Sequence, residues 1–224
     1  MRVLGIETAT ELASVALVED GEVLAEVLLP LQRKLTEELV PVIDWTLKRA
    51  GVKLGELDGV AVSIGPGSFT GLRVGASTAK GLCFACELPL VAVPTLKAMA
   101  SRLALSQLPI CPLLDARRNQ IYSALYKFEG GSLKELSPPR ATSLEELLSS
   151  LDLPVVFTGD AVGKFRRKIE EELKDGAIFA PPELSRPAAS SVAALGSVAL
   201  AEGEISDLSS LEPIYIRSPV CRRS

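Results

Sequence analysis

The sequence predicts an α/β protein built of two lobes related by duplication. Short apolar runs typical of buried strands alternate with longer segments of helical periodicity. The order of these segments starts again near residue 110, and 47% of the 224 residues are apolar, so a sizeable core is available. We therefore expect an N-terminal lobe over residues 1–106 and a smaller C-terminal lobe over residues 107–224, which carries a terminal helix and a tail.

The first lobe begins with three expected strands, of which the second and third are joined by an Asp20-Gly21 turn. The five strands expected in this lobe cover residues 3–6, 12–18, 22–29, 59–64 and 90–93. Apolar residues at helical spacing predict a helix over 35–50, which Gly51 is placed to end. Further helices are expected up to about Cys86 and from Pro94 onward.

The second lobe repeats this order. Its expected strands cover residues 110–114, 120–128, 133–136 and 155–158, and its helices cover 144–148 and 162–173. The segments IETATELASVAL and LDARRNQIYSAL align without gaps at an offset of 108 and place Glu7 over Asp115. An acid at the end of the first strand of each copy is typical of a duplicated ribonuclease-H-like unit. In such a fold the two lobes face each other across a cleft, with these acids near its floor.

Composition excludes several classes of function. The chain has no histidine, so it lacks the commonest metal ligand and general base, and with it the Ser/His/Asp and Cys/His nucleophile systems. Its net charge of −4 disfavours contacts with phosphates, and its 4% of aromatic residues leaves few side chains for base stacking. If the protein acts on RNA, we therefore expect a partner to make most of the RNA contacts. The chain has no apolar run of membrane-spanning length and no signal-peptide pattern, so we expect a cytoplasmic protein without membrane association.

The stretch SIGPGSFTGLRVG, residues 63–75, runs from an expected strand through a glycine-rich loop into a helix. This layout can cradle phosphate, because backbone N–H groups at a helix N-terminus approach the ligand. However, no lysine follows Gly71, and Thr70 stands where a G-x-G-x-x-G motif needs its third glycine. With Ser68 as a natural N-cap, the stretch is better interpreted as a tight corner between strand and helix.

The helix after this corner is small or apolar around most of its circumference. A polar wedge is formed only by Arg73, Ser77 and Lys80. A helix of this kind is usually buried on more than one side, so one side can face the sheet and the other a second helix, within the monomer or on a partner. Helical glycines each cost roughly 1 kcal/mol relative to alanine, which favours close approach of another backbone. We expect a partner interface on this helix, formed by Leu72, Gly75, Ala76, Ala79 and Cys83.

The only tryptophan, Trp45, lies opposite the apolar face of the preceding helix and is expected to flank this interface as an anchor.

Cys83 and Cys86 have the spacing of a redox or zinc motif. They lie at the far end of their helix, where the dipole does not lower a thiol pKa, and no second cysteine pair accompanies them. We therefore predict that they pack in the core and that the chain has no metal site.

Glu7, Thr8 and Asp115 are the candidates for a nucleotide cleft. The turn after Glu7 could touch phosphate as it does in actin-like ATPases, although carboxylates in turns are common. An actin-like ATPase or small-molecule kinase that uses Glu7 and Asp115 with Mg-ATP is therefore the main alternative function. A homodimeric storage or regulatory module is a third. Arg217, Arg222 and Arg223 form a small basic cluster in the tail, which we interpret as solvated.

Three stretches resemble the bacterial TsaB (YeaZ) family: VLGIETATELASVALVEDG, GVAVSIGPGSFTGLRVGASTAKGL and PLLDARRNQIYSALY. The resemblance extends to the closing EPIYIR. It implies an actin-like (ASKHA) fold and a non-catalytic subunit of the machinery that makes N6-threonylcarbamoyladenosine at position 37 of tRNA. It further implies pairing with a catalytic TsaD-type subunit through a bundle of the two helices described above, the joining of a TsaE-type ATPase, and self-association of the same helices.

The resemblance also implies that this chain contacts tRNA only as part of the complex. No cofactor is expected to bind tightly, although ATP or ADP could lie at the interface with the catalytic subunit. Two departures from the family pattern matter: Glu7 replaces the usual aspartate, and Leu35 stands where a histidine is frequent. Without histidine, this chain cannot reproduce the metal site of TsaD-type proteins.

Overall fold

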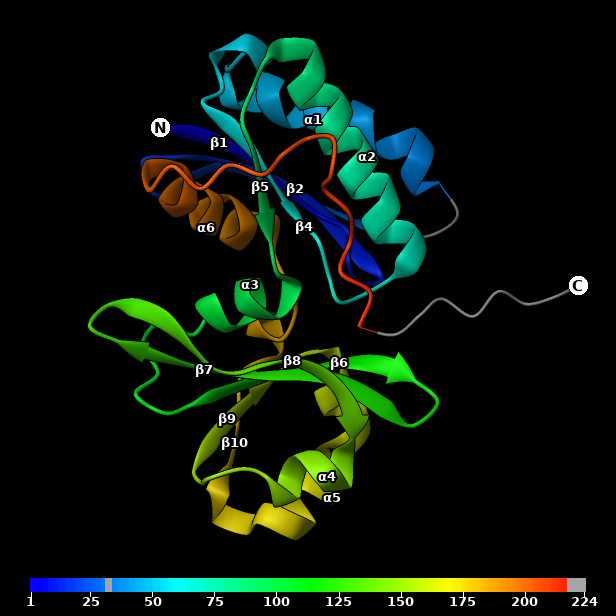
Figure 1. The fold of residues 1–224 in the computed structure, drawn as a ribbon, viewed down its shortest axis with the longest axis vertical. Coiled ribbons are helices and arrows are strands. Elements are labelled where there is room, and N and C mark those ends of the chain that lie inside the picture. Colours follow the sequence, from blue (N-terminus) through cyan, green and yellow to red (C-terminus); the bar gives the residue numbers. More distant parts are fainter. Residues whose placement is uncertain (31–33, 217–224) are drawn as a thin grey trace, which may run out of the picture. The chain divides into compact units, whose positions relative to one another are not determined.

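The computed structural model describes residues 1–30 and 34–216 (Figure 1). The chain divides into two compact units. Among the described residues, the first unit consists of Met1–Ala98 and Ala188–Ile214, and the second of Met99–Pro187 with residues 215–216. The chain therefore leaves the first unit after Ala98, returns to it at Ala188, and leaves it again after Ile214.

The first unit is built on a five-stranded sheet in the order β3-β2-β1-β4-β5. Its strands are β1 (Arg2–Glu7), β2 (Leu12–Glu19), β3 (Glu22–Pro30), β4 (Gly59–Ser63) and β5 (Leu90–Val93). Ile6 in β1 lies opposite Val15 in the antiparallel β2 and opposite Val62 in the parallel β4. The β2–β3 hairpin turns at Asp20 and Gly21, which both have positive φ, as the sequence predicted.

Helices cover both faces of this sheet (Figure 1). On one face, α1 (Leu35–Ala50) packs over β2 and β3, and α2 (Phe69–Cys86) packs over β1 and β4. On the other face, α6 (Ala189–Ala201) packs over β1, β4 and β2. This approach is close, because an added methyl group at Gly5 would overlap the backbone of α6, and one at Gly196 would overlap Ala61 of β4.

The second unit has a sheet in the order β10-β9-β6-β7-β8. Its strands are β6 (Ile110–Arg117), β7 (Gln120–Glu129), β8 (Ser132–Ser143), β9 (Val155–Thr158) and β10 (Ala177–Phe179). Helices α4 (Leu144–Ser149) and α5 (Asp160–Leu173) enclose its core, and the short helix α3 (Thr95–Ser101) contains the boundary between the units. Read from β8, the order is β8-β7-β6-β9-β10, which repeats the topology of the first sheet. The duplicated α/β fold predicted from the sequence is therefore confirmed.

The structure differs from the predicted lobe boundaries at the terminal helix. We expected residues 107–224 to form one lobe, whereas α6 belongs to the first unit. The reason is that the α6-facing side of the first sheet is apolar and needs a cover, which Val192 and Ala193 provide by packing with Val3. A helix without a polar face gives no sequence signal of which sheet it covers.

Strand β8 is also longer than the 133–136 expected. It contains Pro138 and Pro139, which interrupt a strand pattern in sequence but are tolerated on an edge strand. The predicted basic cluster Arg217, Arg222 and Arg223 lies outside the described residues, as does Cys221.

Candidate partner-docking surface

The glycine-rich corner packs on the turn that follows β1. Ser68 caps α2 by accepting a hydrogen bond from Gly71 N at 3.3 Å. Added methyl groups at Gly71 and Gly75 would overlap the carbonyl and the hydroxyl of Thr8, respectively. The glycines therefore permit a close approach, as predicted, but the backbone that approaches belongs to this chain and not to a partner.

The five α2 residues predicted as a partner interface lie on the core side of the helix. Leu72, Gly75, Ala76, Ala79 and Cys83 are all buried. Ala76, Ala79 and Cys83 pack with β1, β4 and α1 residues in the main core of the first unit. The predicted face was thus the wrong one: a bulky charge at Ala76 would disrupt folding of the unit, rather than only its pairing with a partner.

A different surface of α1 and α2 is free of the core. We call it the outer face of α1 and α2, and it comprises the exposed residues Val40, Pro41, Trp45, Ser77, Gly81, Phe84 and Ala85. Trp45 is 48% exposed and Phe84 is 82% exposed, which is unusual for aromatic side chains. The prediction that Trp45 projects away from the core is confirmed. Because α1 and α2 contact each other on one face of the sheet, these residues belong to neighbouring helices.

Two arginines cover aromatic rings on these helices. The Arg49 guanidinium lies 5.1 Å from the centroid of Trp45, and that of Arg73 lies 4.0 Å from the centroid of Phe69. Such contacts hold a ring in place while leaving part of its face available. Phe84 is the most exposed of the three aromatic side chains on α1 and α2. The outer face thus offers aromatic anchors between polar groups, as protein interfaces commonly do.

Sequence reasoning missed Phe84. It lies next to Cys83, and the core residues of α2 recur at 72, 75, 76, 79 and 83, so position 84 falls outside the core stripe. A phenylalanine off the apolar stripe of a helix was the signal that could have found it. Cys83 and Cys86 were both predicted to pack in the core. Cys83 is buried, and burial raises the pKa of its thiol to about 12, whereas Cys86 is only half-buried.

Glu7 and Thr8 are brought together at the end of β1, and both are fully buried. Ala9 N donates a hydrogen bond to Glu7 Oε1 at 2.5 Å, whereas Glu7 Oε2 and Thr8 Oγ1 have no hydrogen-bond partner among the described residues. Burial raises the pKa of Glu7 to about 7, against the opposing effects of the Ala9 amide and the Ser63 hydroxyl. Glu7 is therefore a carboxyl group that sits close to its titration point at neutral pH.

Asp115 lies in the second unit, at the end of β6, and is exposed. Its carboxylate accepts hydrogen bonds from Arg117 N at 2.8 Å and from Lys164 Nζ at 3.2 Å. These contacts give it a local role in the β6–β7 turn. Within the described ranges, no group of three or more Cys, Asp or Glu side chains could hold a metal ion, and no helix is long and apolar enough to span a membrane.

Comparison with known proteins places the chain in a family. The family model described as "TsaD: tRNA N6-adenosine threonylcarbamoyltransferase" matches residues 22–222. The "tRNA threonylcarbamoyladenosine biosynthesis protein TsaB" of Bacillus subtilis is 30% identical, over 97% of this chain and 94% of the relative. The protein of the same name from Escherichia coli is 30% identical, over 98% of this chain and 96% of the relative. The chain belongs to the TsaB family.

The transferase relatives match over a shorter length than the TsaB proteins of Bacillus subtilis and Escherichia coli do. A tRNA N6-adenosine threonylcarbamoyltransferase from Trichlorobacter lovleyi is 32% identical, but only over 58% of this chain and 43% of the relative. The structure of YeaZ from Pseudomonas aeruginosa superposes with a TM-score of 0.83 and 27% identity, over 96% of this chain and 99% of that one. End-to-end similarity is thus to TsaB-family proteins.

More distant structures establish the wider fold class. A ROK hexokinase from Thermus thermophilus has a TM-score of 0.51 and 12% identity, and component A of (R)-2-hydroxyglutaryl-CoA dehydratase from Acidaminococcus fermentans has a TM-score of 0.54 and 11% identity. At this identity the likeness concerns the fold alone. With the repeated sheet topology, it confirms the actin-like (ASKHA) fold that the resemblance implied.

Proposed function

We propose that this TsaB-family chain acts in the biosynthesis of threonylcarbamoyladenosine in tRNA, as a non-catalytic subunit that docks on and activates a catalytic TsaD-type subunit. The observation that carries the role in biosynthesis is the end-to-end similarity to proteins named for this pathway in two well-separated bacteria. The absence of histidine supports the non-catalytic part, because the chain lacks the usual general base and metal ligand.

The docking surface in this proposal is the outer face of α1 and α2. Trp45 and Phe84 supply exposed aromatic surface, and Gly81 has open space where a side chain would project. A partner helix can therefore approach the α2 backbone closely at Gly81 while the two rings bury against it. A TsaE-type ATPase would join this complex. The chain would contact tRNA only as part of the complex, and ATP or ADP would bind at its interface with the catalytic subunit.

The alternative function, an ATPase or kinase that uses Glu7 and Asp115, has less support. Glu7 and Thr8 are fully buried, Thr8 lies against Gly71 and Gly75 of α2, and Asp115 is paired with Lys164. Calorimetry of the isolated chain with Mg-ATP separates the two functions. The subunit proposal expects weak binding or none, whereas tight binding with turnover would favour the enzyme.

The docking proposal is tested with Phe84→Glu and Trp45→Ala. Each removes an exposed ring, so the fold should be kept, and we expect each to weaken binding of the TsaD-type subunit by ~30-fold or more, as loss of an interface hot spot does. Leu136→Glu is the matched control, because Leu136 is similarly exposed but lies on β8 of the second unit.

Binding is measured by calorimetry, and threonylcarbamoyladenosine formation by mass spectrometry of tRNA from reactions with each variant. We expect modification to fall with binding for Phe84→Glu and to stay at the wild-type level for Leu136→Glu. A Phe84→Glu protein that binds and activates as well as the wild type would rule out this surface.

A further inference from the structure

A pocket of about 180 Å³ lies where the edge strand β5 meets α6, on the sheet face opposite α1 and α2 (Figure 1). Its lining comes from β5, α3, α6 and the segment that follows α6, and all of these residues belong to the first unit. The pocket is therefore separate from the outer face of α1 and α2, and the proposed function gives it no role.

Hydrogen bonds hold the segment after α6 against the free edge of β5. Ser206 N donates to Leu90 O at 2.8 Å, and Ser206 Oγ accepts from Ala92 N at 3.0 Å. At the start of this segment, Glu204 N donates to Ala199 O at 2.8 Å. The backbone on this side of the pocket is therefore fixed before a ligand arrives, as is usual for small-molecule sites.

One part of the pocket is apolar. Val91 and Val93 of β5 are buried, and Leu195 and Ala199 of α6 are half-buried. Ile205 also lines the pocket, although its side chain is 61% exposed. A ligand with an apolar group would remove part of this surface from water, which is favourable.

The volume of the pocket limits the size of its ligand. A cavity of about 150 Å³ holds one benzene molecule, so this pocket takes a ligand of roughly six to ten non-hydrogen atoms. Nucleotides and coenzymes are larger than this, and they occupy larger sites.

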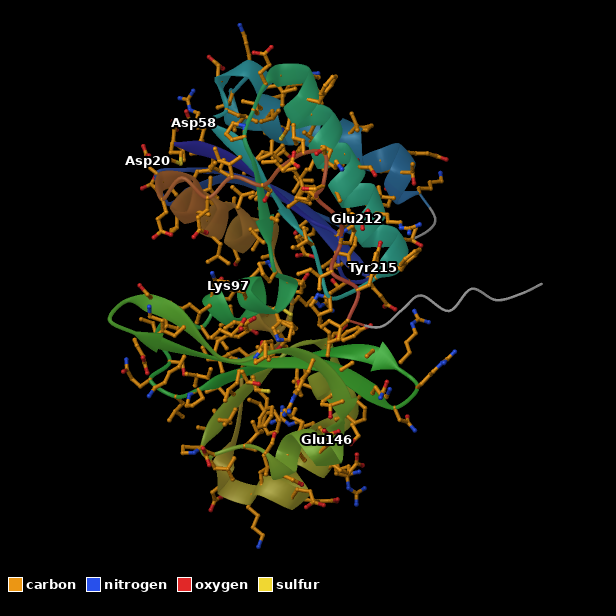
Figure 2. All side chains as sticks on the ribbon, viewed as in Figure 1. Asp20, Asp58, Lys97, Glu146, Glu212 and Tyr215 are labelled. Carbon is orange, nitrogen blue, oxygen red and sulfur yellow. The ribbon has the colours of Figure 1, made fainter. Side chains whose placement is uncertain are left out.

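The remaining lining is polar and carries two charges of opposite sign. Lys97 comes from α3 (Figure 2), and Glu204 from the segment after α6. Neither side chain forms an ion pair within the described part of the chain. Since the Ser206 hydroxyl accepts its bond from Ala92 N, its proton remains to be donated to a ligand. The pocket thus offers a cation, an anion and a hydroxyl donor beside an apolar wall.

We propose that this pocket binds a free α-amino acid with an aliphatic side chain, such as leucine or valine. The carboxylate of the ligand pairs with Lys97 and accepts the Ser206 hydroxyl proton, and its ammonium group pairs with Glu204. The aliphatic side chain packs on the wall that β5 and α6 form. This inference does not depend on the proposed function.

The two charges favour an amino acid over other small molecules. A fatty acid would leave Glu204 without a partner, and an alkylamine would leave Lys97 without one, whereas an amino acid satisfies both. Glu204 is exposed and Lys97 only half-buried, so each ion pair contributes little. We therefore expect a dissociation constant of roughly 0.1–1 mM.

Calorimetry of the full chain with L-leucine and L-valine, up to about 20 mM, tests the proposal over this range. 4-Methylpentanoate is leucine without its ammonium group, and 3-methylbutylamine is leucine without its carboxylate. Each should bind ~3-fold or more weakly than leucine, because one ion pair is lost. The proposal is overturned if neither amino acid binds, or if the two single-charge analogues bind as well as leucine does.

Charge reversal tests the assignment of the site. Lys97→Glu and Glu204→Lys should each weaken leucine binding at least ~10-fold, since repulsion replaces attraction. Glu202→Lys is the matched control, because Glu202 is exposed in the same stretch of chain but does not line the pocket. It should bind leucine as the wild type does. Reversals that leave binding unchanged, or a control that weakens it equally, would show that these charges do not hold the ligand.

A pocket-filling variant tests the apolar wall with both charges kept. Ala199→Leu places a larger side chain in the pocket and should abolish leucine binding. Urea unfolding of every variant checks its fold. Leucine should raise the unfolding midpoint of the wild type and of Glu202→Lys but not of Glu204→Lys, because a ligand stabilises only the state that it binds. A folded Ala199→Leu protein that binds leucine with wild-type affinity would place the ligand elsewhere.

Discussion

Replacing Glu7 by glutamine removes a charge that the first unit buries at the end of β1. The pKa of this carboxyl is raised from 4.5 to about 7 by burial. Between these two values the folded state holds a proton that the unfolded state has released. The free energy of unfolding is therefore greatest below pH 4.5, falls as pH rises through 7, and is level above it. A difference of about 2.5 pKa units corresponds to about 3 kcal/mol in total.

About 2 kcal/mol of this change lies between pH 5.5 and pH 8.5. Glu7→Gln removes the titration while keeping an oxygen that can accept the hydrogen bond from Ala9 N. We therefore expect the variant to gain about 2 kcal/mol of stability relative to the wild type over this interval, whatever constant offset the amide group adds. The sign of the slope is the diagnostic quantity, since an ordinary surface carboxylate contributes no such change.

The assay is urea unfolding at several pH values, followed by the fluorescence of Trp45. This residue is the only tryptophan and lies in the first unit, so the signal reports on the unit that contains Glu7. Curves of unfolding free energy against pH that run parallel for Glu7→Gln and the wild type would refute the reasoning. They would mean that Glu7 is ionised in the folded protein at neutral pH and finds a partner there.

Three further predictions concern the packing of the two units. Gly75→Ala should destabilise the unit by roughly 1–3 kcal/mol because its methyl group overlaps the turn after β1, whereas Gly81→Ala, with open space around it, should stabilise it by about 0.5–1 kcal/mol in urea unfolding. Glu26→Ala should cost about 1 kcal/mol, because this carboxylate accepts hydrogen bonds at the start of α6, and amide exchange there should quicken. Cys83 and Cys111, both buried with thiol pKa values raised to about 12, should react with a thiol reagent only after unfolding; rapid labelling of the native chain would contradict this.

Most strands and helices of this fold were predictable because the residues that form them carry local signals, whereas the three-residue strand β10 was missed. Gly51 ends α1 in the left-handed conformation, Asp20 and Gly21 make the hairpin turn, and Ser68 caps α2. Each of these depends on one or two residues and on backbone geometry alone. The duplication was likewise visible, since the same order of signals occurs twice.

The orientation of α2 was not predictable in the same way. Gly71, Gly75 and Ala79 on one side resemble Ser77, Gly81 and Ala85 on the other, so the helix has no strong apolar asymmetry. Which side meets the sheet is decided by the close fit to Thr8, a contact between residues more than 60 positions apart. Tertiary contacts of this kind leave no periodic trace in the sequence. The same holds for α6, which has no polar face to mark its outward side.

The return of the chain to the first unit affects the order of events during synthesis. β1 to β5 leave the ribosome long before α6, which is about 100 residues further along. At a synthesis rate of ~5–20 residues per second, α6 emerges about 5–20 s after the strands of the sheet that it covers. Over that interval Val3, Ala61 and Val91 lack Val192 and Ala193, with which they pack in the finished unit. The strands of the second sheet, by contrast, have all emerged once β10 is made, so a helix synthesised after the second sheet covers the sheet that began to form first.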